Sequence, residues 1–318
     1  MKVKSEVFNC DCMELMAKMP DKSVNLIICD GPYFKICGKK FDWAFKTMQD
    51  WINWHIKLRD EFERILADNG SLFVFGDDKN IAYLQIEFDK KFNLLNNIVY
   101  KKRSPITMKG IDNFNCFAPV TERILFYDKG ENKTGLEMIK KIMPNPFAEY
   151  LREEFKKAKI NNREIASLFP SASGGLTGCI SNWLNGNNIM SKEQYLKVRN
   201  HLNNKYLRKE YEDLRKEYED LRRIFNNKYR LTDVIDAKVH SGWHPTIKDL
   251  SVIIKLIETT TKEGDLVFSP FIGSGTDRIA SYDTKRNFVG CELDKEYFDL
   301  MEDRFKKHIS QLSIFDII

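Results

Sequence analysis

A glycine-containing turn and a following acidic residue form the first pattern in the 318-residue sequence that suggests chemistry. Ser269 to Thr276, with the letters SPFIGSGT, directly follows the apolar run Leu266-Val267-Phe268. Glycines at a strand-to-helix turn let a ligand approach the backbone closely. Glu292 ends the next apolar run, where a carboxylate can accept hydrogen bonds from both hydroxyls of a ribose. This order predicts a site for a nucleoside-containing cofactor, and the lack of a third glycine disfavours a dinucleotide.

A second pattern places an acid at the end of a buried strand. Val24 to Cys29 is apolar and leads directly into Asp30-Gly31-Pro32-Tyr33, with Phe34 behind it. Ligands of open α/β sheets bind at the carboxyl ends of the strands, so we expect Asp30 and Tyr33 to face a cleft. Asp-Gly-Pro alone would indicate only a β-turn with a capping aspartate. Its combination with the glycine turn indicates a catalytic site.

The segments around these motifs alternate between strand and helix patterns. In the first part of the chain, strands are expected at 24–29, 71–76 and 124–127, and a helix at 51–67 that ends at an Asn69-Gly70 cap. In the last part, a helix is expected at 250–260, a strand at 266–268, a helix from Ile279 and a strand at 288–292. This alternation predicts a mostly parallel sheet covered by helices, formed jointly by residues 1–140 and 238–318.

Residues 141–237 have a different, helical character. Short helices are expected at 151–158, 162–169, 177–184 and 192–202, and tight turns between them resemble a helix-turn-helix module. Tyr150 to Arg230 contains 17 Lys or Arg against 10 Asp or Glu, so this stretch carries +7 of a total net charge of only +5. The excess favours a surface that faces a polyanion, although a solvated helical cap would have a similar composition.

A heptad repeat follows within this helical part. Tyr211-Glu212-Asp213-Leu214-Arg215 recurs seven residues later as Tyr218-Glu219-Asp220-Leu221-Arg222, which places Tyr211, Leu214, Tyr218, Leu221 and Phe225 on one helix face. Two heptads are too few for an independent coiled coil. We therefore expect a helix that packs on the body of the protein or on a partner helix.

Composition limits the cellular setting. Neither a membrane-spanning apolar run nor a signal peptide is expected, which favours the cytoplasm. The seven cysteines form no CxxC pair and lie near no histidine at zinc spacing, so no metal site is predicted.

Taken together, the motifs resemble those of the DNA amino-methyltransferases. Asp30-Gly31-Pro32-Tyr33 resembles their DPPY motif, and Ser269 to Thr276 resembles their DPFxGSGT cofactor motif. His244-Pro245-Thr246-Ile247-Lys248 is similar to the HPTxK segment that precedes it. The catalytic motif comes first, then a variable insert, then the cofactor motif, and this permuted order is that of the β class. Gly31 and Ser269 depart from the usual proline and aspartate, and Ser269 removes a charge expected to face the cofactor's ammonium group.

The resemblance implies a fold, a reaction and a set of site residues. The fold is an α/β, Rossmann-like sheet that binds S-adenosyl-L-methionine, with a helical target-recognition insert at 141–237. The chain is expected to resemble restriction-modification enzymes, and the Tyr-Glu-Asp-Leu-Arg repeats are similar to those of a phage-associated branch. Catalysis is assigned to four residues: Asp30, Gly31, Pro32 and Tyr33. Cofactor binding is assigned to Asp11, Cys12, Lys248, Ser269, Phe271, Gly273, Ser274, Gly275, Thr276 and Glu292, with Asp11 and Cys12 at the adenine, Glu292 at the ribose and Lys248 at the carboxylate.

The expected activity is methylation of adenine N6 in double-stranded DNA after base flipping. Asp at position 30 favours adenine, and cytosine N4 is the alternative within the same enzyme class. A non-catalytic DNA-binding protein on a degenerate scaffold is an alternative of a different class, which the altered Gly31 and Ser269 would support. A homodimer is a further expectation, based on the class and on the tyrosine-leucine face.

Overall fold

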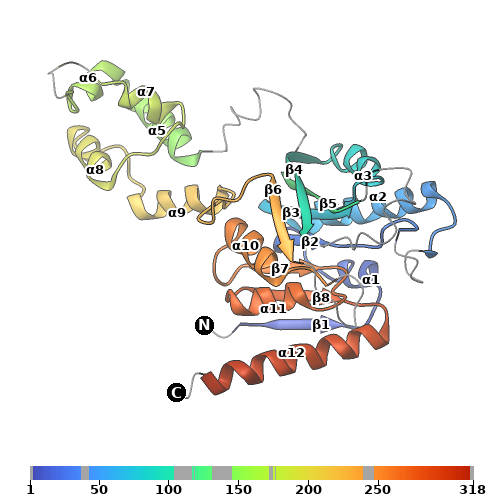
Figure 1. Cartoon of the computed structure of the whole chain (residues 1–318). Coiled ribbons are helices and arrows are strands. Elements are labelled where there is room, and N and C mark those ends of the chain that lie inside the picture. The colour runs from blue at the N-terminus through green and yellow to red at the C-terminus, as the bar shows by residue number, and fades with distance from the viewer. Residues whose placement is uncertain are drawn as a thin grey trace. The chain divides into compact units, whose positions relative to one another are not determined.

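The computed structural model describes residues 3–36, 43–103, 117, 119–130, 145–171, 175, 177–238 and 247–315. The chain divides into two compact units, one formed by 1–134 with 223–318 and one formed by 135–222. We refer to them as the sheet unit and the helical unit and describe each separately (Figure 1). No helix in the described part of the chain is long and apolar enough to cross a membrane.

The sheet unit is built on eight strands in the order β1-β8-β7-β2-β3-β5-β4-β6. Every neighbouring pair is parallel except the two pairs that involve β5, so the expectation of a mostly parallel sheet is confirmed. The strands are β1 (Ser5–Phe8), β2 (Val24–Cys29), β3 (Leu66–Asp77), β4 (Phe92–Arg103), β5 (Thr121–Lys129), β6 (Val234–Lys238), β7 (Leu266–Ser269) and β8 (Asn287–Cys291).

Alternation of side chains along the strands divides the sheet unit's core into two layers. Ile27 and Cys29 of β2 pack in one layer with residues of α1 (Cys12–Met16), α2 (Met48–Ile65) and α3 (Ile81–Phe88). Leu26 and Ile28 pack in the other with residues of α10 (Leu250–Thr260), α11 (Thr276–Asp283) and α12 (Lys295–Phe315). Because successive strand residues point to opposite faces, a strand buried on both faces reads as a continuous apolar run.

The ends of three neighbouring parallel strands position the site. Leu26 of β2 is in register with Val267 of β7, and Ser269 of β7 is in register with Gly290 of β8. The carboxyl ends of parallel strands meet at one edge of a sheet. The segments that follow β2, β7 and β8 are therefore brought together there, although they are far apart in sequence.

The expected helix cap at Asn69-Gly70 is wrong. Helix α2 ends at Ile65, and strand β3 begins at Leu66, whose φ of −69° and ψ of 132° are already extended. Leu66 is completely buried, and a Cβ on Gly70 would lie 2.6 Å from its Cδ1. The glycine therefore permits close packing within the strand instead of ending the helix.

The helical unit contains α5 (Pro146–Ala158), α6 (Asn162–Ser167), α7 (Cys179–Leu184), α8 (Lys192–His201) and α9 (Tyr211–Leu221). The heptad face of α9 is only partly buried: Tyr211 and Leu214 join this unit's core, whereas Leu221 is 43% exposed. The Tyr211 ring lies 5.7 Å from that of Phe147, so α9 packs on α5.

The boundaries of the helical unit differ from the expected insert at 141–237. Residues 223–237 belong to the sheet unit, where β6 pairs in parallel with β4. Strand β6 has alternating burial over only five residues, a short pattern within a charged region. Such a pattern gives little sequence signal.

Candidate active site

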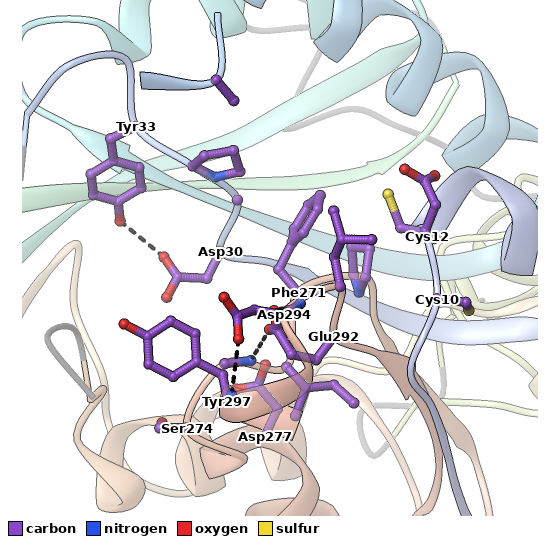
Figure 2. A pocket seen from close by; sticks show the side chains of 18 of the residues that line it. Cys10, Cys12, Asp30, Tyr33, Phe271, Ser274, Asp277, Glu292, Asp294 and Tyr297 are labelled. Atoms are coloured by element: carbon purple, nitrogen blue, oxygen red, sulfur yellow. Dashed lines mark hydrogen bonds between the residues drawn. The ribbon is translucent and has the colours of Figure 1, made fainter. Parts of the chain in front are cut away.

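A pocket of about 980 Å³ lies at the carboxyl ends of β2, β7 and β8 (Figure 2). Among the residues that the structure describes, its lining contains six carboxylates and one ammonium group: Asp11, Asp30, Asp277, Glu292, Asp294 and Glu296 against Lys248. Aromatic and apolar side chains complete it, among them Tyr33, Trp43, Phe45, Trp54, Phe271, Ile272 and Tyr297. The lining therefore suits a cationic ligand with flat, apolar parts.

Most of the residues assigned from the sequence line this pocket. They are Asp11, Cys12, Asp30, Gly31, Pro32, Tyr33, Lys248, Phe271, Gly273, Ser274, Thr276 and Glu292. Ser269 and Gly275 are not among the lining residues: Ser269 is fully buried, and Gly275 is the N-cap of α11. His244 to Thr246 of the HPTxK segment lie outside the described residues.

The Asp30 carboxylate is held from two sides. The Tyr33 hydroxyl donates a hydrogen bond of 3.0 Å to Asp30 Oδ1, and Lys248 Nζ lies 2.9 Å from Asp30 Oδ2. Lys248 Nζ also lies 3.2 Å from Glu122 Oε2, and Lys102 pairs with the other oxygen of Glu122. Two carboxylates and two ammonium groups thus form a network of charges beside the pocket, in which Glu122 and Lys248 are buried and Lys102 is 40% exposed.

Burial and neighbouring charges have opposite effects on the pKa values of these groups. Burial raises the pKa of Asp30 above its usual value, although the Lys248 ammonium opposes the rise. Burial also acts to lower the pKa of Lys248, but Asp30 and Glu122 outweigh it and raise that pKa. Burial acts to raise the pKa of Glu122, yet Lys248 and Lys102 leave it below its usual value. The lysine thus favours the ionised forms of both acids.

The turn after Asp30 is fixed by its neighbours. Trp51 Nε1 donates a hydrogen bond of 2.9 Å to the Pro32 carbonyl. A Cβ on Gly31 would lie 3.1 Å from Phe271 Cε2, so the two motifs pack directly against each other. A side chain at position 31 would have to displace the Phe271 ring by a few tenths of an ångström.

The glycine turn is held by Glu292 and requires its glycines. Gly273 N–H donates to Glu292 Oε2 at 3.0 Å, and Asp294 N–H donates to Glu292 Oε1 at 3.0 Å. Gly275 has a φ of +81°, and a Cβ there would lie 2.5 Å from Met301 Cγ. Burial raises the pKa of Glu292, and its carboxylate keeps lone pairs for further donors.

Asp11 and Cys12 lie on the other side of the pocket at the start of α1. The Asp11 side chain caps this helix, accepting a 2.7 Å hydrogen bond from Met13 N–H. Cys12 is buried, and burial raises the pKa of its thiol to about 12. The thiol is therefore a small apolar group in this lining, not a nucleophile.

Sequence reasoning missed several residues at this site. Glu122 comes from β5, and Asp277 from the first turn of α11. Arg304 of α12 donates from Nη1 to the Ser274 carbonyl at 2.7 Å and to Thr276 Oγ1 at 3.1 Å, so it supports the glycine turn. Asp277 could have been noticed because it directly follows the glycine motif. Glu122 and Arg304 have no local signal in the sequence.

Lys248, which was expected to hold the cofactor's carboxylate, lines the pocket. Its ammonium group contacts Asp30, Glu122 and the Tyr33 hydroxyl, the last at 3.4 Å. These contacts place Lys248 beside the catalytic acid, where its charge acts on Asp30 directly.

Comparison with known proteins agrees with this geometry. The sequence profile of the N6/N4 DNA methylase family matches residues 24–303, which span both motifs and the segment between them. The chain belongs to the N6/N4 DNA methylase family. It is a DNA methyltransferase that uses S-adenosyl-L-methionine, as the motifs implied.

Relatives and solved structures extend the likeness over almost the whole chain. The Type II methyltransferase M2.DpnII of Streptococcus pneumoniae is 22% identical over 324 residues, covering 96% of this chain and 91% of the relative. The Type II methyltransferase M.BamHI of Bacillus amyloliquefaciens is 24% identical and covers 95% of this chain and 57% of the relative. The expected resemblance to restriction-modification methyltransferases is confirmed.

Two solved structures share the fold. The PvuII DNA methyltransferase, a cytosine-N4-specific enzyme, aligns with a TM-score of 0.55 at 12% identity and covers 96% of this chain and 87% of its own. The Thermus thermophilus protein TTHA0409, complexed with S-adenosyl-L-methionine, aligns with a TM-score of 0.52 at 18% identity over 96% and 94% of the two chains. The β-class α/β fold expected from the motif order is confirmed.

The pocket fits this cofactor on its own evidence. S-adenosyl-L-methionine carries a sulfonium and an ammonium group against one carboxylate, and the pocket has an excess of carboxylates. The volume of about 980 Å³ is at the upper end of the usual range for ligand sites, which leaves room for a base beside the cofactor.

Proposed function

We propose that this enzyme methylates N6 of adenine in double-stranded DNA. The observation that carries the proposal is the Asp30 carboxylate, positioned next to the glycine turn and held there by Tyr33 and Lys248. Adenine is preferred over cytosine because an aspartate stands at position 30, where cytosine-N4 enzymes more often carry serine. Cytosine N4 is the second candidate, because the PvuII enzyme is cytosine-N4-specific. That enzyme is only 12% identical to this chain.

Asp30 and the Gly31 carbonyl are the groups that act on the amine. The lone pair of an aromatic amine is delocalised into the ring, so the nitrogen is a poor nucleophile. Two acceptors on its two N–H bonds favour a pyramidal nitrogen and direct its lone pair out of the ring plane. As positive charge develops on the nitrogen, the Asp30 carboxylate stabilises the transition state more strongly than the ground state.

The cofactor supplies a methyl group on sulfonium, which needs no further activation when bound. The protein therefore mainly has to align the amine with the methyl group, and the rigid glycine turn serves this alignment. Phe271 packs on Gly31, and Glu292 holds the Gly273 amide, so the two motifs share one framework. Glu292 is proposed to bind the ribose, with Asp11 and Cys12 at the adenine ring.

Tyr33 is the proposed stacking partner of the target base. An amino group inside a duplex is inaccessible, so the base is flipped into the pocket. Stacking on an aromatic ring is worth about 1–3 kcal/mol and offsets part of the cost of unstacking. The hydrogen bond from the Tyr33 hydroxyl to Asp30 fixes the ring beside the acid.

The helical unit is proposed to read the DNA target, since the basic excess falls in and around it. A homodimer through the tyrosine-leucine face of α9 is a further proposal. Its support is the exposure of Leu221, which leaves the end of that face available.

The test is product analysis after methyl transfer from labelled S-adenosyl-L-methionine to duplex DNA. Digestion to nucleosides should give labelled N6-methyl-2′-deoxyadenosine from the wild type and no labelled product from Asp30→Ala. N4-methylcytosine as the only product would overturn the adenine assignment. A wild type that binds DNA but transfers nothing would favour the non-catalytic alternative.

A further inference from the structure

Ser269 and Asp277 together form a feature that the methyltransferase motif does not explain. Ser269 stands where the resembled motif has an aspartate, and Asp277 directly follows the GSGT letters. Ser269 Oγ donates a hydrogen bond of 2.9 Å to Asp277 Oδ2, and both side chains are buried. The hydroxyl at the end of β7 thus orients a carboxylate that comes from the first turn of α11.

The Asp277 carboxylate faces the pocket (Figure 2). Asp277 belongs to the pocket lining, whereas Ser269 is fully buried and is not one of the lining residues. Asp277 forms no ion pair within the described part of the chain, and an unpaired buried carboxylate is costly.

The two described cations whose charges act on Asp277, Lys248 and Arg304, are engaged elsewhere. Arg304 of α12 donates to the glycine turn, and Lys248 pairs with Asp30 and Glu122. Asp30 adds a like charge from the end of β2. Burial, with a smaller contribution from Asp30, raises the pKa of Asp277 to about 7, although Ser269, Lys248 and Arg304 oppose the rise. A bound cation would relieve both costs.

We propose that the Asp277 carboxylate, oriented by Ser269, binds the α-ammonium group of S-adenosyl-L-methionine. Asp277, in the first turn of the helix that follows β7, thereby supplies the negative charge that is missing at position 269. The inference concerns cofactor binding alone and does not depend on which base is methylated.

The test compares two ligands in the absence of DNA. Calorimetry measures the Kd of S-adenosylhomocysteine, which has the α-ammonium group, and of its analogue that lacks the α-amino group. Asp277→Asn should weaken S-adenosylhomocysteine about 10- to 100-fold, as expected for one charge-assisted hydrogen bond. The same variant should leave the Kd of the deaminated analogue unchanged. Equal losses for both ligands, or no loss for either, would overturn the proposal.

Two further variants separate binding from folding. Asp283→Asn removes an exposed carboxylate at the other end of α11, where it pairs with His308, and should change neither Kd. Ser269→Ala removes only the orienting hydroxyl and should weaken the amino ligand selectively but less than Asp277→Asn. Thermal melting of each variant shows whether the fold is intact. A Ser269→Ala variant that folds and binds both ligands normally would contradict the orienting role.

The pH dependence gives a second readout. Protonation of Asp277 removes its attraction for the ammonium group, so affinity for S-adenosylhomocysteine should fall from pH 7.5 to pH 6. Asp30, Lys248 and Arg304 surround Asp277 in both proteins, so the comparison with Asp277→Asn isolates its contribution. The variant should lose this part of the dependence. An identical pH profile in both proteins would count against the proposal.

Discussion

Lys248 Nζ lies 2.9 Å from Asp30 Oδ2 and joins the two halves of the sheet unit at the catalytic acid. The lysine is buried, and Glu122 lies on its other side at 3.2 Å. Beside the Lys102–Glu122 pair, Lys248 is therefore the ammonium group that lies between the two carboxylates. Its removal would leave like charges facing each other in a medium where they are poorly screened.

Lys248→Met should move the acid limb of the methyl-transfer profile to higher pH. The lysine opposes the burial that raises the pKa of Asp30, so its loss raises that pKa further. The ionised form, which accepts the amine N–H, then needs a higher pH. The measurement is single-turnover transfer against pH at saturating cofactor, so that Asp277 titration does not contribute through binding.

The same substitution should lower the free energy of unfolding by about 3–5 kcal/mol near neutral pH, because it breaks a buried ion pair. Lys262→Met, at an exposed position, is the matched control and should alter neither property. An unchanged acid limb in a folded Lys248→Met protein would show that the ion pair does not set the protonation of Asp30.

Tyr33→Phe and Tyr33→Ala separate the two roles of this tyrosine. Phenylalanine keeps the ring but loses the hydrogen bond to Asp30, which costs about 0.5–1.5 kcal/mol. Alanine also loses the stacking surface, a further loss of about 1–3 kcal/mol. We expect kcat/KM for duplex DNA to decline in that order. A substrate with a mismatch at the target should recover part of the alanine loss, because the base is already unpaired.

Equal activities of the two Tyr33 variants would contradict a stacking role. Binding of S-adenosylhomocysteine should be similar in both, which keeps a cofactor defect distinct from a base-binding defect.

Much of the sheet could be predicted because its strands are buried on both faces. Val24 to Cys29 and Leu266 to Phe268 are continuous apolar runs, and acids or glycines mark their carboxyl ends. Strand β4, by contrast, contains charged and amide residues, and β6 is only five residues long. These two strands lie at one end of the sheet, where they carry polar side chains. The polar side chains obscure the apolar pattern by which a strand is recognised.

The candidate site was predictable where chemistry and chain position coincide. Asp30 and Glu292 directly follow strands, and the glycine turn has a recognisable order of residues. Glu122 was not predictable, because its role depends on the antiparallel pairing of β5 with β3, which no local pattern specifies. The end of α2 also differs from the sequence-based expectation. The helix ends at Ile65, before Asn69-Gly70, and Leu66 is extended and packs in the core.

Gly275→Ala should destabilise the glycine turn and weaken cofactor binding. The φ of +81° disfavours an L side chain, and the added Cβ would lie 2.5 Å from Met301 Cγ. The strain should lower the free energy of unfolding by about 1–3 kcal/mol and raise the Kd for S-adenosylhomocysteine. Gly178→Ala is the control, because a Cβ there meets nothing within 4 Å. Wild-type binding by a stable Gly275→Ala protein would contradict a rigid turn.

Neutralising basic residues of the helical unit should weaken DNA binding without affecting the cofactor. Lys156, Lys159 and Arg163 are exposed around the junction of α5 and α6. Each lost phosphate contact should reduce the slope of log K against log salt by about 0.9. Substitution of all three by glutamine is therefore expected to flatten the slope by up to about 3 units, measured by fluorescence anisotropy on a duplex. Lys57→Gln and Lys262→Gln, exposed in the sheet unit, serve as controls, and the Kd of S-adenosylhomocysteine should be the same in all variants. A slope equal to that of the wild type would show that this part of the helical unit does not contact the DNA backbone, and would direct the search for the target-recognition surface to α8 and α9.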